Sequence, residues 1–352
     1  MHRVAVLAGD GVGPEVVSVA RACVDALGLE LAWHELDWGS DRWLRTGAMM
    51  PADGIDQLRA FDAVLLGAVG RPDVPDDVSL WGLLLPIRQR LDLWANERPV
   101  RLLPGVPCAL AGREPHEIDM LFVRENTEGE YAGVGGRAHD GLPDEVAIEA
   151  GVFTRRGIER VCEHAFARAR ARRGILTSAT KSNASRFGYV LWDEVCGEVA
   201  SRYPDVRYER VLVDALCARM VLNPGSLDVI VASNLFGDIL TDLGAAIQGG
   251  MGMAASANLC PGGSVPGVFE PVHGSAPDIA GTGVANPCGA VWAAASMLEA
   301  LGEPAAAARI LAAIADVCAS GPRTRDLGGS ATTAEIEAAL VRVLRSGNER
   351  GS

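Results

Sequence analysis

Lysine is almost absent from this sequence of 352 residues, in which 31 arginines accompany a single lysine, Lys181. On a protein surface either cation is solvated, so arginine can replace lysine there easily. The replacement fails where an amine must lose and regain a proton, because a guanidinium stays charged at any ordinary pH. Composition bias could also have spared one lysine, and the residues around Lys181 must decide between the two interpretations.

The sequence also lacks a positive net charge and long apolar runs. Its formal net charge is −13, which makes nucleic acid and anionic membranes poor partners. No apolar run reaches the roughly 20 residues that span a bilayer. The N-terminus reads as a strand and a turn, without the apolar region of a signal peptide. We therefore expect a cytoplasmic protein.

Cysteine pairs with metal-binding spacing are absent as well. The eight cysteines are scattered, and no C-x-x-C occurs. This distribution predicts buried thiols of a cytosolic protein, rather than disulfides or zinc ligands. Hydrophobic residues make up 49% of the chain, which is enough for one large unit or for two lobes that share a cleft.

Short apolar runs that end in glycine-rich turns alternate with segments of helical periodicity, which predicts βαβ units and a largely parallel sheet. We expect strands at residues 3–8, 61–69, 119–124, 174–180 and 228–233, and helices at 13–28, 80–94, 236–247, 289–301 and 304–318. Residues 132–152, rich in glycine and then β-like, are predicted to form a projecting arm. The basic run at 168–173 is expected to be a solvated helix face.

Two acids stand four residues apart in NLFGDILTDLG, just after a predicted buried strand. This spacing places Asp238 and Asp242 on one face of a helix, where the like charges repel unless a cation lies between them. Mg²⁺ or Mn²⁺ takes such carboxylates and leaves positions for substrate oxygens. Asp214, which ends the apolar run VLVD, is a plausible third ligand. The alternative is a pair of solvated acids that the helix dipole favours.

Three arginines lie where a solvated cation is not expected: Arg88 on an apolar helix, Arg98 in ANERPVR, and Arg124 at the end of a buried strand. Planar guanidinium groups bind carboxylates through two parallel hydrogen bonds, so three of them would suit a dicarboxylate. An internal salt bridge is the alternative for each. Tyr131 could serve as a proton donor near a lysine and a metal, and structural packing is its default role.

The glycines at the N-terminus only partly match a dinucleotide-binding loop. Gly9, Gly11 and Gly13 are present, but the full G-x-G-x-x-G is not, Pro14 follows at once, and no clear acidic strand end lies about twenty residues later. We therefore exclude an ordinary Rossmann site.

The segment EPVHGSAPDIAGTGVANP is a better cofactor candidate. Gly274 and Gly281 allow close backbone approach, and His273 and Asn286 offer hydrogen bonds to a base. Asp278 could bind a ribose hydroxyl pair, and its charge would repel a 2′-phosphate, which favours NAD over NADP.

These stretches together resemble the β-decarboxylating dehydrogenases, the family of isopropylmalate, isocitrate, homoisocitrate and tartrate/D-malate dehydrogenases. The resemblance covers nearly the whole chain and rests on GDGVGPE at 9–15, LLGAVGRP at 65–72, WGLLLPIRQRLDLWANERPVR at 81–101, VRENTEGEY at 123–131, TSATKSN at 177–183, SNLFGDILTDLG at 233–244, and EPVHGSAPDIAGTGVANP at 270–287.

The resemblance implies an isopropylmalate dehydrogenase-like, two-lobed α/β fold with a large mixed, mostly parallel sheet. It assigns residues 1–95 and 250–352 to a discontinuous NAD-binding domain. Residues 96–249 would form the domain for metal, substrate and dimerisation. A homodimer is implied because each site would draw on two chains, with Lys181 and Asp214 serving the site of the partner.

The resemblance also implies residue roles. Lys181 would accept the substrate's hydroxyl proton, Tyr131 would help protonate the enolate, and Asp214, Asp238 and Asp242 would hold Mg²⁺ or Mn²⁺. A monovalent cation is a further candidate cofactor. The implied substrate-binding residues are Arg88, Arg98, Arg124, Trp81 and Leu84, and the implied NAD-binding residues are His273, Gly274, Ser275, Ala276, Asp278, Ile279 and Asn286.

Within the family, Trp81, ENTEGEY and ATKSN are similar to the tartrate/D-malate branch. Isopropylmalate enzymes usually carry an acid where Trp81 stands, and leucines at 83 and 85 argue against isocitrate. The expected reaction is oxidation of D-malate, to pyruvate and CO₂, or of tartrate. The alternatives are a dehydrogenase of 3-isopropylmalate or another 3-substituted malate, and a non-catalytic regulatory subunit. Such subunits usually lose the catalytic residues that are all present here.

Overall fold

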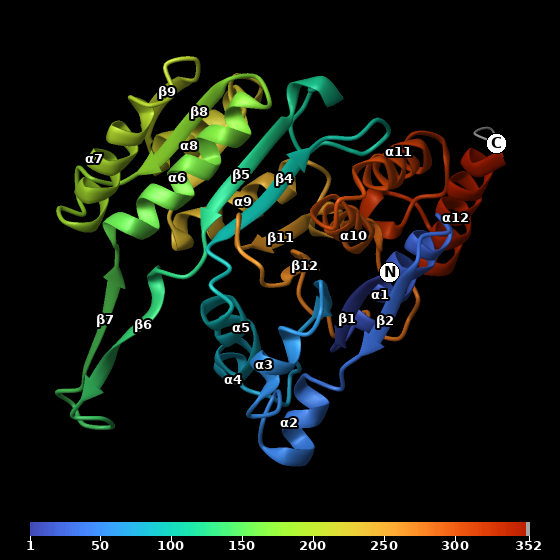
Figure 1. Ribbon diagram of the computed structural model, residues 1–352, viewed down its shortest axis with the longest axis horizontal. Coiled ribbons are helices and arrows are strands. Elements are labelled where there is room, and N and C mark those ends of the chain that lie inside the picture. The colour runs from blue at the N-terminus through green and yellow to red at the C-terminus, as the bar shows by residue number, and fades with distance from the viewer. Residues whose placement is uncertain (350–352) are drawn as a thin grey trace.

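A ten-stranded sheet runs through the molecule, with helices on both of its faces (Figure 1). The computed structural model describes residues 1–349. The strand order is β2-β1-β3-β12-β11-β4-β5-β10-β8-β9. The strands are β1 His2–Gly9, β2 Leu31–Glu35, β3 Ala63–Ala68, β4 Ala95–Arg101, β5 Asp119–Glu125, β8 Ile175–Thr180, β9 Arg207–Leu212, β10 Val229–Ala232, β11 Ala255–Leu259 and β12 Gly267–Pro271.

The sheet is mixed and mostly parallel, which confirms the expected fold class. The three antiparallel pairs lie together in the middle, where β11 pairs with β12 and β4, and β4 pairs with β5. The strands on either side pair in parallel. The predicted division into two domains would cross the sheet between β11 and β4, and it stays a prediction.

Helices pack against the alternating apolar residues of the strands. In β1, Val4 and Val6 face a core with α1 and α10, whereas Ala5 and Leu7 face a second core with α5.

The helices are α1 Gly13–Asp25, α2 Ser40–Thr46, α3 Gly54–Leu58, α4 Asp76–Ser79, α5 Leu85–Arg90, α6 Arg155–Arg170, α7 Gly188–Ala200, α8 Val213–Leu222, α9 Asn234–Ile247, α10 Cys288–Ala300, α11 Pro304–Ser320 and α12 Thr333–Glu349. Shorter helical turns are η1 Leu80–Leu84, η2 Pro115–Glu117, η3 Pro224–Ser226, η4 Met251–Met253 and η5 Arg325–Leu327. No described helix is long and apolar enough to cross a membrane.

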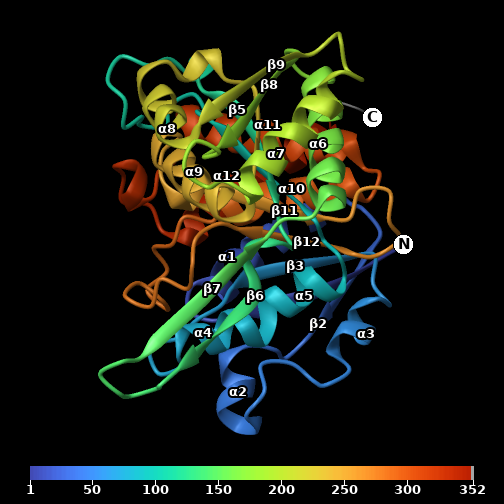
Figure 2. The same cartoon turned by 90° about the vertical axis from the view of Figure 1, so that its left-hand side faces the viewer.

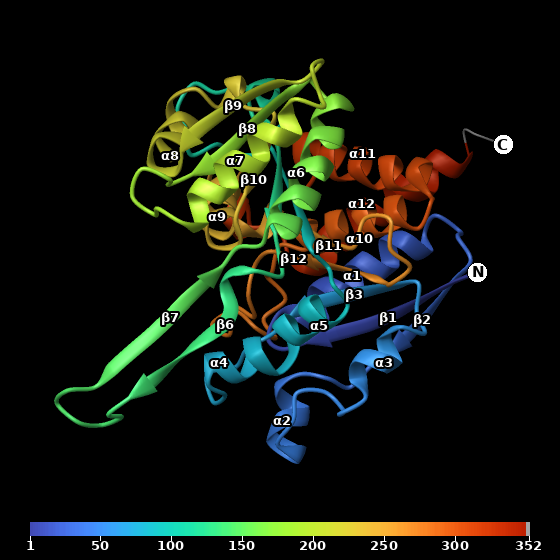
Figure 3. The ribbon, with the colours of Figure 1, turned by 60° about the vertical axis from the view of Figure 1, so that its left-hand side comes forward.

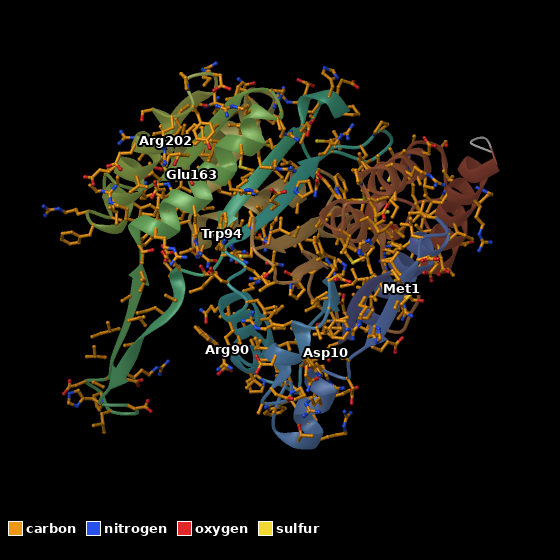
Figure 4. All side chains as sticks on the ribbon, in the orientation of Figure 1. Met1, Asp10, Arg90, Trp94, Glu163 and Arg202 are labelled. Atoms are coloured by element: carbon orange, nitrogen blue, oxygen red, sulfur yellow. A yellow bond between two sulfur atoms is a disulfide. The ribbon has the colours of Figure 1, made fainter. Side chains whose placement is uncertain are left out.

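Two predicted helices have different limits in the structure. The helix expected at 13–28 ends at Asp25, and Gly28 follows in the left-handed conformation, with φ of 75°, which ends helices readily. The helix expected at 80–94 is a π turn followed by the short α5, with Pro86 in its first turn. Trp94, labelled in Figure 4, then leads into β4 beside α6. The Arg160 guanidinium carbon lies 5.2 Å from the centre of the Trp94 ring.

A two-stranded antiparallel arm, β6 (Gly129–Ala138) and β7 (Val146–Val152), projects from the body (Figure 3). It covers the range predicted for a projecting arm, residues 132–152, and begins slightly earlier, at Gly129. Several of its apolar side chains are exposed, Ile148 by 66% and Val134 by 50%. Apolar side chains on a projecting hairpin are typical of a surface that another chain covers.

One cysteine prediction is wrong. Cys162 on α6 and Cys196 on α7 are paired as a disulfide, with Cα atoms 6.0 Å apart, which lies within the usual disulfide range. The packing of α6 against α7 brings together two residues that are 34 positions apart in the sequence. The spacing of cysteines in the sequence could not have predicted this pair. The other six cysteines, all within the described chain, are free thiols.

The basic run that ends α6 is also not simply solvated. Arg168 Nε lies 3.1 Å from Glu97 Oε1, and His164 Nε2 lies 2.7 Å from the same oxygen. Arg172 Nε donates to Asp228 Oδ1 at 2.9 Å, and Asp228 is fully buried. These two arginines thus also supply the counter-charge that buried acids on neighbouring elements need, although Arg172 itself is exposed.

Candidate active site

Four functional segments follow neighbouring parallel strands. Arg124 lies near the carboxyl end of β5, Asn234 begins α9 just after β10, Lys181 follows β8, and Asp214 follows β9 on α8. The carboxyl ends of parallel strands meet at one edge of a sheet, where ligands of α/β proteins commonly bind. Sheet topology therefore gathers side chains that lie far apart in the sequence.

Arg124 is the centre of this group and is only 2% exposed. Its Nη1 donates to Asp238 Oδ1, and its Nε and Nη2 donate to Asn234 Oδ1 at 3.1 and 2.7 Å. The Tyr131 ring lies 5.7 Å from the Arg124 guanidinium carbon, and its hydroxyl donates to Asp238 Oδ2 at 3.2 Å. Gly237 makes room, since a Cβ there would lie 2.5 Å from Arg124 Cγ.

Arg98 approaches the same acids from β4. Its Nη1 donates to Thr241 Oγ1 at 2.7 Å, and its Nε donates to Asn96 Oδ1 at 2.9 Å. Its guanidinium lies 3.5 Å from Asp238 Oδ1 and 4.0 Å from Asp242 Oδ1. The structure thus brings Arg98, Arg124, Tyr131 and both acids of α9 together.

Arg88 on α5 pairs with Glu270, an acid that sequence reasoning did not single out. Arg88 Nη2 donates to Glu270 Oε1 at 2.8 Å, and Asn258 Nδ2 donates to the same oxygen at 2.9 Å. Asn258 Oδ1 in turn accepts from Asn96 Nδ2 at 3.0 Å, which joins Arg88 to the Arg98 group. The internal salt bridge considered for Arg88 therefore exists. An acid within the buried strand GVFEP was the signal that could have found it.

The arginines stabilise the charge of Asp238 more than that of Asp242. Burial and the Arg98 guanidinium hold the pKa of Arg124 below its usual range. Burial opposes ionisation of Asp238, but Arg124 and Arg98 outweigh it and keep the Asp238 pKa low. Burial and the Asp238 charge raise the pKa of Asp242. Asp242 therefore lacks sufficient positive charge nearby, and oxygen donors in this situation fit a hard divalent cation.

Lys181 and Asp214 form a separate pair, with Lys181 Nζ 2.9 Å from Asp214 Oδ1. Their side chains are 29% and 65% exposed. Within residues 1–349 of one chain, no three acid, histidine or cysteine side chains gather as a metal site. The three predicted metal ligands thus do not converge within the described part of the chain.

Trp81 and Leu84 lie on the π turn η1. The Trp81 indole, 43% exposed, packs against Gly133 at the base of the arm, while Leu84 is partly buried against the core that contains α5. The Gln89 side chain of α5 donates to the Tyr131 carbonyl oxygen at 3.3 Å. The η1–α5 segment therefore runs along the base of β6, beside Tyr131.

The N-terminal glycine loop supports the predicted cofactor loop. Val12 N–H donates to the Ser275 carbonyl at 2.9 Å, and a Cβ on Gly11 would lie 2.0 Å from that oxygen. Glu15 Oε1 accepts from Gly281 N–H at 2.6 Å. The first glycine motif thus holds the second one in place.

The remaining predicted cofactor residues lie on the loop between β12 and α10. His273 Nδ1 faces the Gly274 carbonyl at 2.9 Å, while its buried Nε2 has no hydrogen-bond partner in the described chain. A Cβ on Gly274 would meet nothing within 4 Å. Asn286 Nδ2 donates to Asp326 Oδ2 at 2.9 Å. Ala276 has φ of 42°, Ile279 is partly buried, and Asp278 is exposed.

The sheet with helices on both faces and the site at its edge together define an α/β dehydrogenase. The chain belongs to the isocitrate/isopropylmalate dehydrogenase family, whose profile matches residues 3–340. It is 49% identical to the decarboxylating D-malate dehydrogenase of Escherichia coli, over 97% of this chain and 98% of that protein. It is 48% identical to a probable tartrate dehydrogenase/decarboxylase of Agrobacterium vitis, over 99% of each chain.

A solved structure supports the same assignment. The crystal structure of isocitrate dehydrogenase from Methylococcus capsulatus superposes with a TM-score of 0.90 at 37% identity, over 98% of this chain and all of that one. The full-length similarity to decarboxylating enzymes confirms the predicted resemblance to the tartrate/D-malate branch.

Proposed function

We propose that this chain catalyses the NAD-dependent oxidation of a small 2-hydroxy dicarboxylate, D-malate or tartrate, with β-decarboxylation of the resulting 2-oxo acid. The observation that carries the proposal is the trio of buried guanidinium groups, Arg88, Arg98 and Arg124, around the acids of α9. Full-length relatives named for D-malate and tartrate support this choice of substrate.

The charge of the site favours a dianionic substrate. Arg88, Arg98 and Arg124 are 8%, 6% and 2% exposed. The acids of the group are Glu270, which is buried, and Asp238, which is half-buried. Buried cations need compensating anions. Once Asp238 and Asp242 hold a divalent cation, the pocket carries excess positive charge, and two substrate carboxylates would neutralise it through bidentate hydrogen bonds.

Proton transfers are assigned to side chains of this chain. Lys181, the only amine among the cationic side chains, accepts the proton of the substrate hydroxyl. Tyr131, whose pKa burial raises, keeps its proton at neutral pH and can deliver it to the product carbon. The arginines orient the carboxylates. Asp238 and Asp242, with Asp214 of a partner copy, would hold a divalent cation that polarises substrate oxygens, and NAD bound at the cofactor loop would supply the hydride acceptor.

The cofactor loop fits NAD in two respects. The buried His273 Nε2 lacks a partner, and the space beside Gly274, Gly281 and Gly283 is open enough that a Cβ on any of them would meet nothing. Exposed Asp278 would repel a 2′-phosphate, which favours NAD over NADP. We place Ser275, Ala276, Ile279 and Asn286 in the same site.

A homodimer would complete the site. Large apolar side chains are exposed on α7, α8 and α9, with Phe187 just before α7 at 85%, Leu222 at 72% and Ile239 at 54%. These helices share one side of the molecule with the arm (Figure 2). Covering that side with a second copy would bury the apolar surface and bring Lys181 and Asp214 to the partner's arginines.

The test is turnover by the purified chain with D-malate, tartrate, isocitrate and 3-isopropylmalate, each with NAD or NADP and with Mn²⁺ or Mg²⁺. NADH absorbance and CO₂ release report oxidation and decarboxylation separately. We expect turnover of D-malate or tartrate with NAD, its loss in Arg124→Gln, and its retention in Arg155→Gln, whose arginine pairs with Glu198 on the surface. A preference for 3-isopropylmalate, or no NADH formation at all, would contradict the proposal.

A further inference from the structure

The Asn234 amide has no part in the chemistry proposed above, yet it makes two of the hydrogen bonds that fix Arg124. Its Oδ1 accepts from Arg124 Nε at 3.1 Å and from Arg124 Nη2 at 2.7 Å. Asn234 is 2% exposed, as little as Arg124 itself. Two bonds from one edge of a planar guanidinium fix its orientation. Asn234 therefore sets the direction in which the remaining nitrogen, Nη1, points toward Asp238.

The amide is in turn fixed by the backbone at the base of the arm. Asn234 Nδ2 donates to the Glu128 carbonyl oxygen at 3.0 Å. Gly129 lies against the same side chain, since a Cβ on Gly129 would lie 3.1 Å from Asn234 Cβ. Arg124 can only donate hydrogen bonds and the Glu128 carbonyl can only accept them, so the amide has one possible orientation. An aspartate, which has two acceptor oxygens, could not satisfy both neighbours.

The group that anchors Arg124 is uncharged, and the same holds for Arg98. Arg98 Nε donates to Asn96 Oδ1, another amide oxygen, at 2.9 Å. Arg88 differs from both, because its Nη2 donates to the carboxylate of Glu270 at 2.8 Å. A carboxylate cancels the charge of the guanidinium that it anchors, whereas an amide oxygen holds the guanidinium and leaves its charge in place.

The acids of α9 do not cancel these charges either. Among the residues that the structure describes, Asp238 is the one acid paired with Arg124, and its Oδ1 also lies 3.5 Å from Arg98. Asp242 lies 4.0 Å from Arg98 and is 61% exposed. Both acids are proposed ligands of a divalent cation, which would compensate them. Because a buried cation needs an anion, the charge of Arg124 is available to a substrate carboxylate.

We propose that Asn234 is a positioning residue, which aims Arg124 at a carboxylate of the substrate and leaves the charge of Arg124 uncompensated. Its amide group holds the guanidinium as firmly as an acid would, without competing with the substrate for its charge. The inference rests on the proposed oxidation of a 2-hydroxy dicarboxylate, because it requires that Arg124 binds one of the two carboxylates.

The test compares kcat and KM for D-malate in the natural chain, Asn234→Asp and Asn234→Ala. Both variants lose the bond to Glu128, but only the aspartate still anchors Arg124, and only it adds a charge. We expect Asn234→Asp to raise KM about 10-fold to 100-fold with kcat nearly unchanged, because a nearby negative charge repels the substrate. We expect Asn234→Ala to lower kcat about 100-fold, because the guanidinium is no longer held in its productive position.

A binding measurement tests the free charge without turnover. Titration calorimetry with Mn²⁺ present compares succinate, a dianion, with succinamate, which has a similar shape and one negative charge. We expect the natural chain to bind succinate about 10-fold to 100-fold more tightly, and Asn234→Asp to lose most of this preference. The control is Gln57→Glu, which adds the same charge at an exposed amide on α3 and should behave as the natural chain does.

Each contrary outcome has a distinct meaning. Equal losses of kcat in both variants, with lower thermal unfolding temperatures and an unchanged preference for succinate, reduce Asn234 to a structural role. Equal binding of succinate and succinamate by the natural chain overturns the uncompensated charge, even if neither variant folds. Normal D-malate turnover by the natural chain leaves the proposed function standing in both cases. If the natural chain oxidises no 2-hydroxy dicarboxylate, the proposed function fails and the role of Asn234 fails with it.

Discussion

Replacing Lys181 with arginine separates charge from proton transfer. The lysine forms an ion pair with Asp214 at 2.9 Å, in which the two side chains are 29% and 65% exposed. An ion pair this exposed is screened by water and contributes little to stability, and a guanidinium can still form it. We therefore expect Lys181→Arg to change the free energy of unfolding by no more than about 0.5 kcal/mol.

The effect on catalysis should be far larger. A guanidinium stays protonated at any ordinary pH and cannot accept the hydroxyl proton. Loss of a positioned general base typically costs about 10²-fold to 10⁴-fold in rate, and we expect kcat on D-malate to fall by that factor. NADH binding, followed by fluorescence titration, and the dimer fraction, measured by analytical ultracentrifugation, should stay near those of the natural chain.

Two further measurements sharpen this test. Raising the pH should not restore Lys181→Arg, because its guanidinium stays charged. A small primary amine added to Lys181→Ala should restore part of the lost rate, because it supplies the missing base in solution. Substantial turnover by Lys181→Arg at neutral pH would refute the assignment, whatever the amine experiment showed.

Three other predictions follow from the same group of side chains. Glu270→Gln leaves a buried guanidinium without its counter-charge and should lower the free energy of unfolding by about 1.5–3 kcal/mol in urea titrations; an unchanged value would contradict this. Because the pKa of Asp242 is raised, Mn²⁺ must displace a proton from its carboxyl group as the pH falls. Titration calorimetry should therefore show weaker Mn²⁺ binding below that pKa. An affinity that does not change with pH would contradict this prediction. Gly237→Ala places a Cβ 2.5 Å from Arg124 Cγ and should cost about 1–3 kcal/mol and raise the KM for substrate, whereas Gly197→Ala, which meets nothing, should not destabilise the protein.

Sequence patterns predicted the local elements well because those patterns arise between near neighbours. Short apolar runs that end in glycine-rich turns predicted β1 and β3, and the spacing of Asp238 and Asp242 placed both on one helix, as α9 shows. The antiparallel centre of the sheet was not predictable in this way. Strand order depends on contacts between segments far apart in the chain, and hydrophobic periodicity within a segment carries no information about them.

The sequence by itself determined which chemical groups are available: one amine, three arginines in apolar segments, and paired acids after a strand. Only the tertiary structure decided their partners. Arg88 meets Glu270 across 182 residues, and Arg124 meets Asp238 across 114. The physical reason is that a residue's type fixes its charge and reach, whereas the order of strands in the sheet fixes which charges share a buried site.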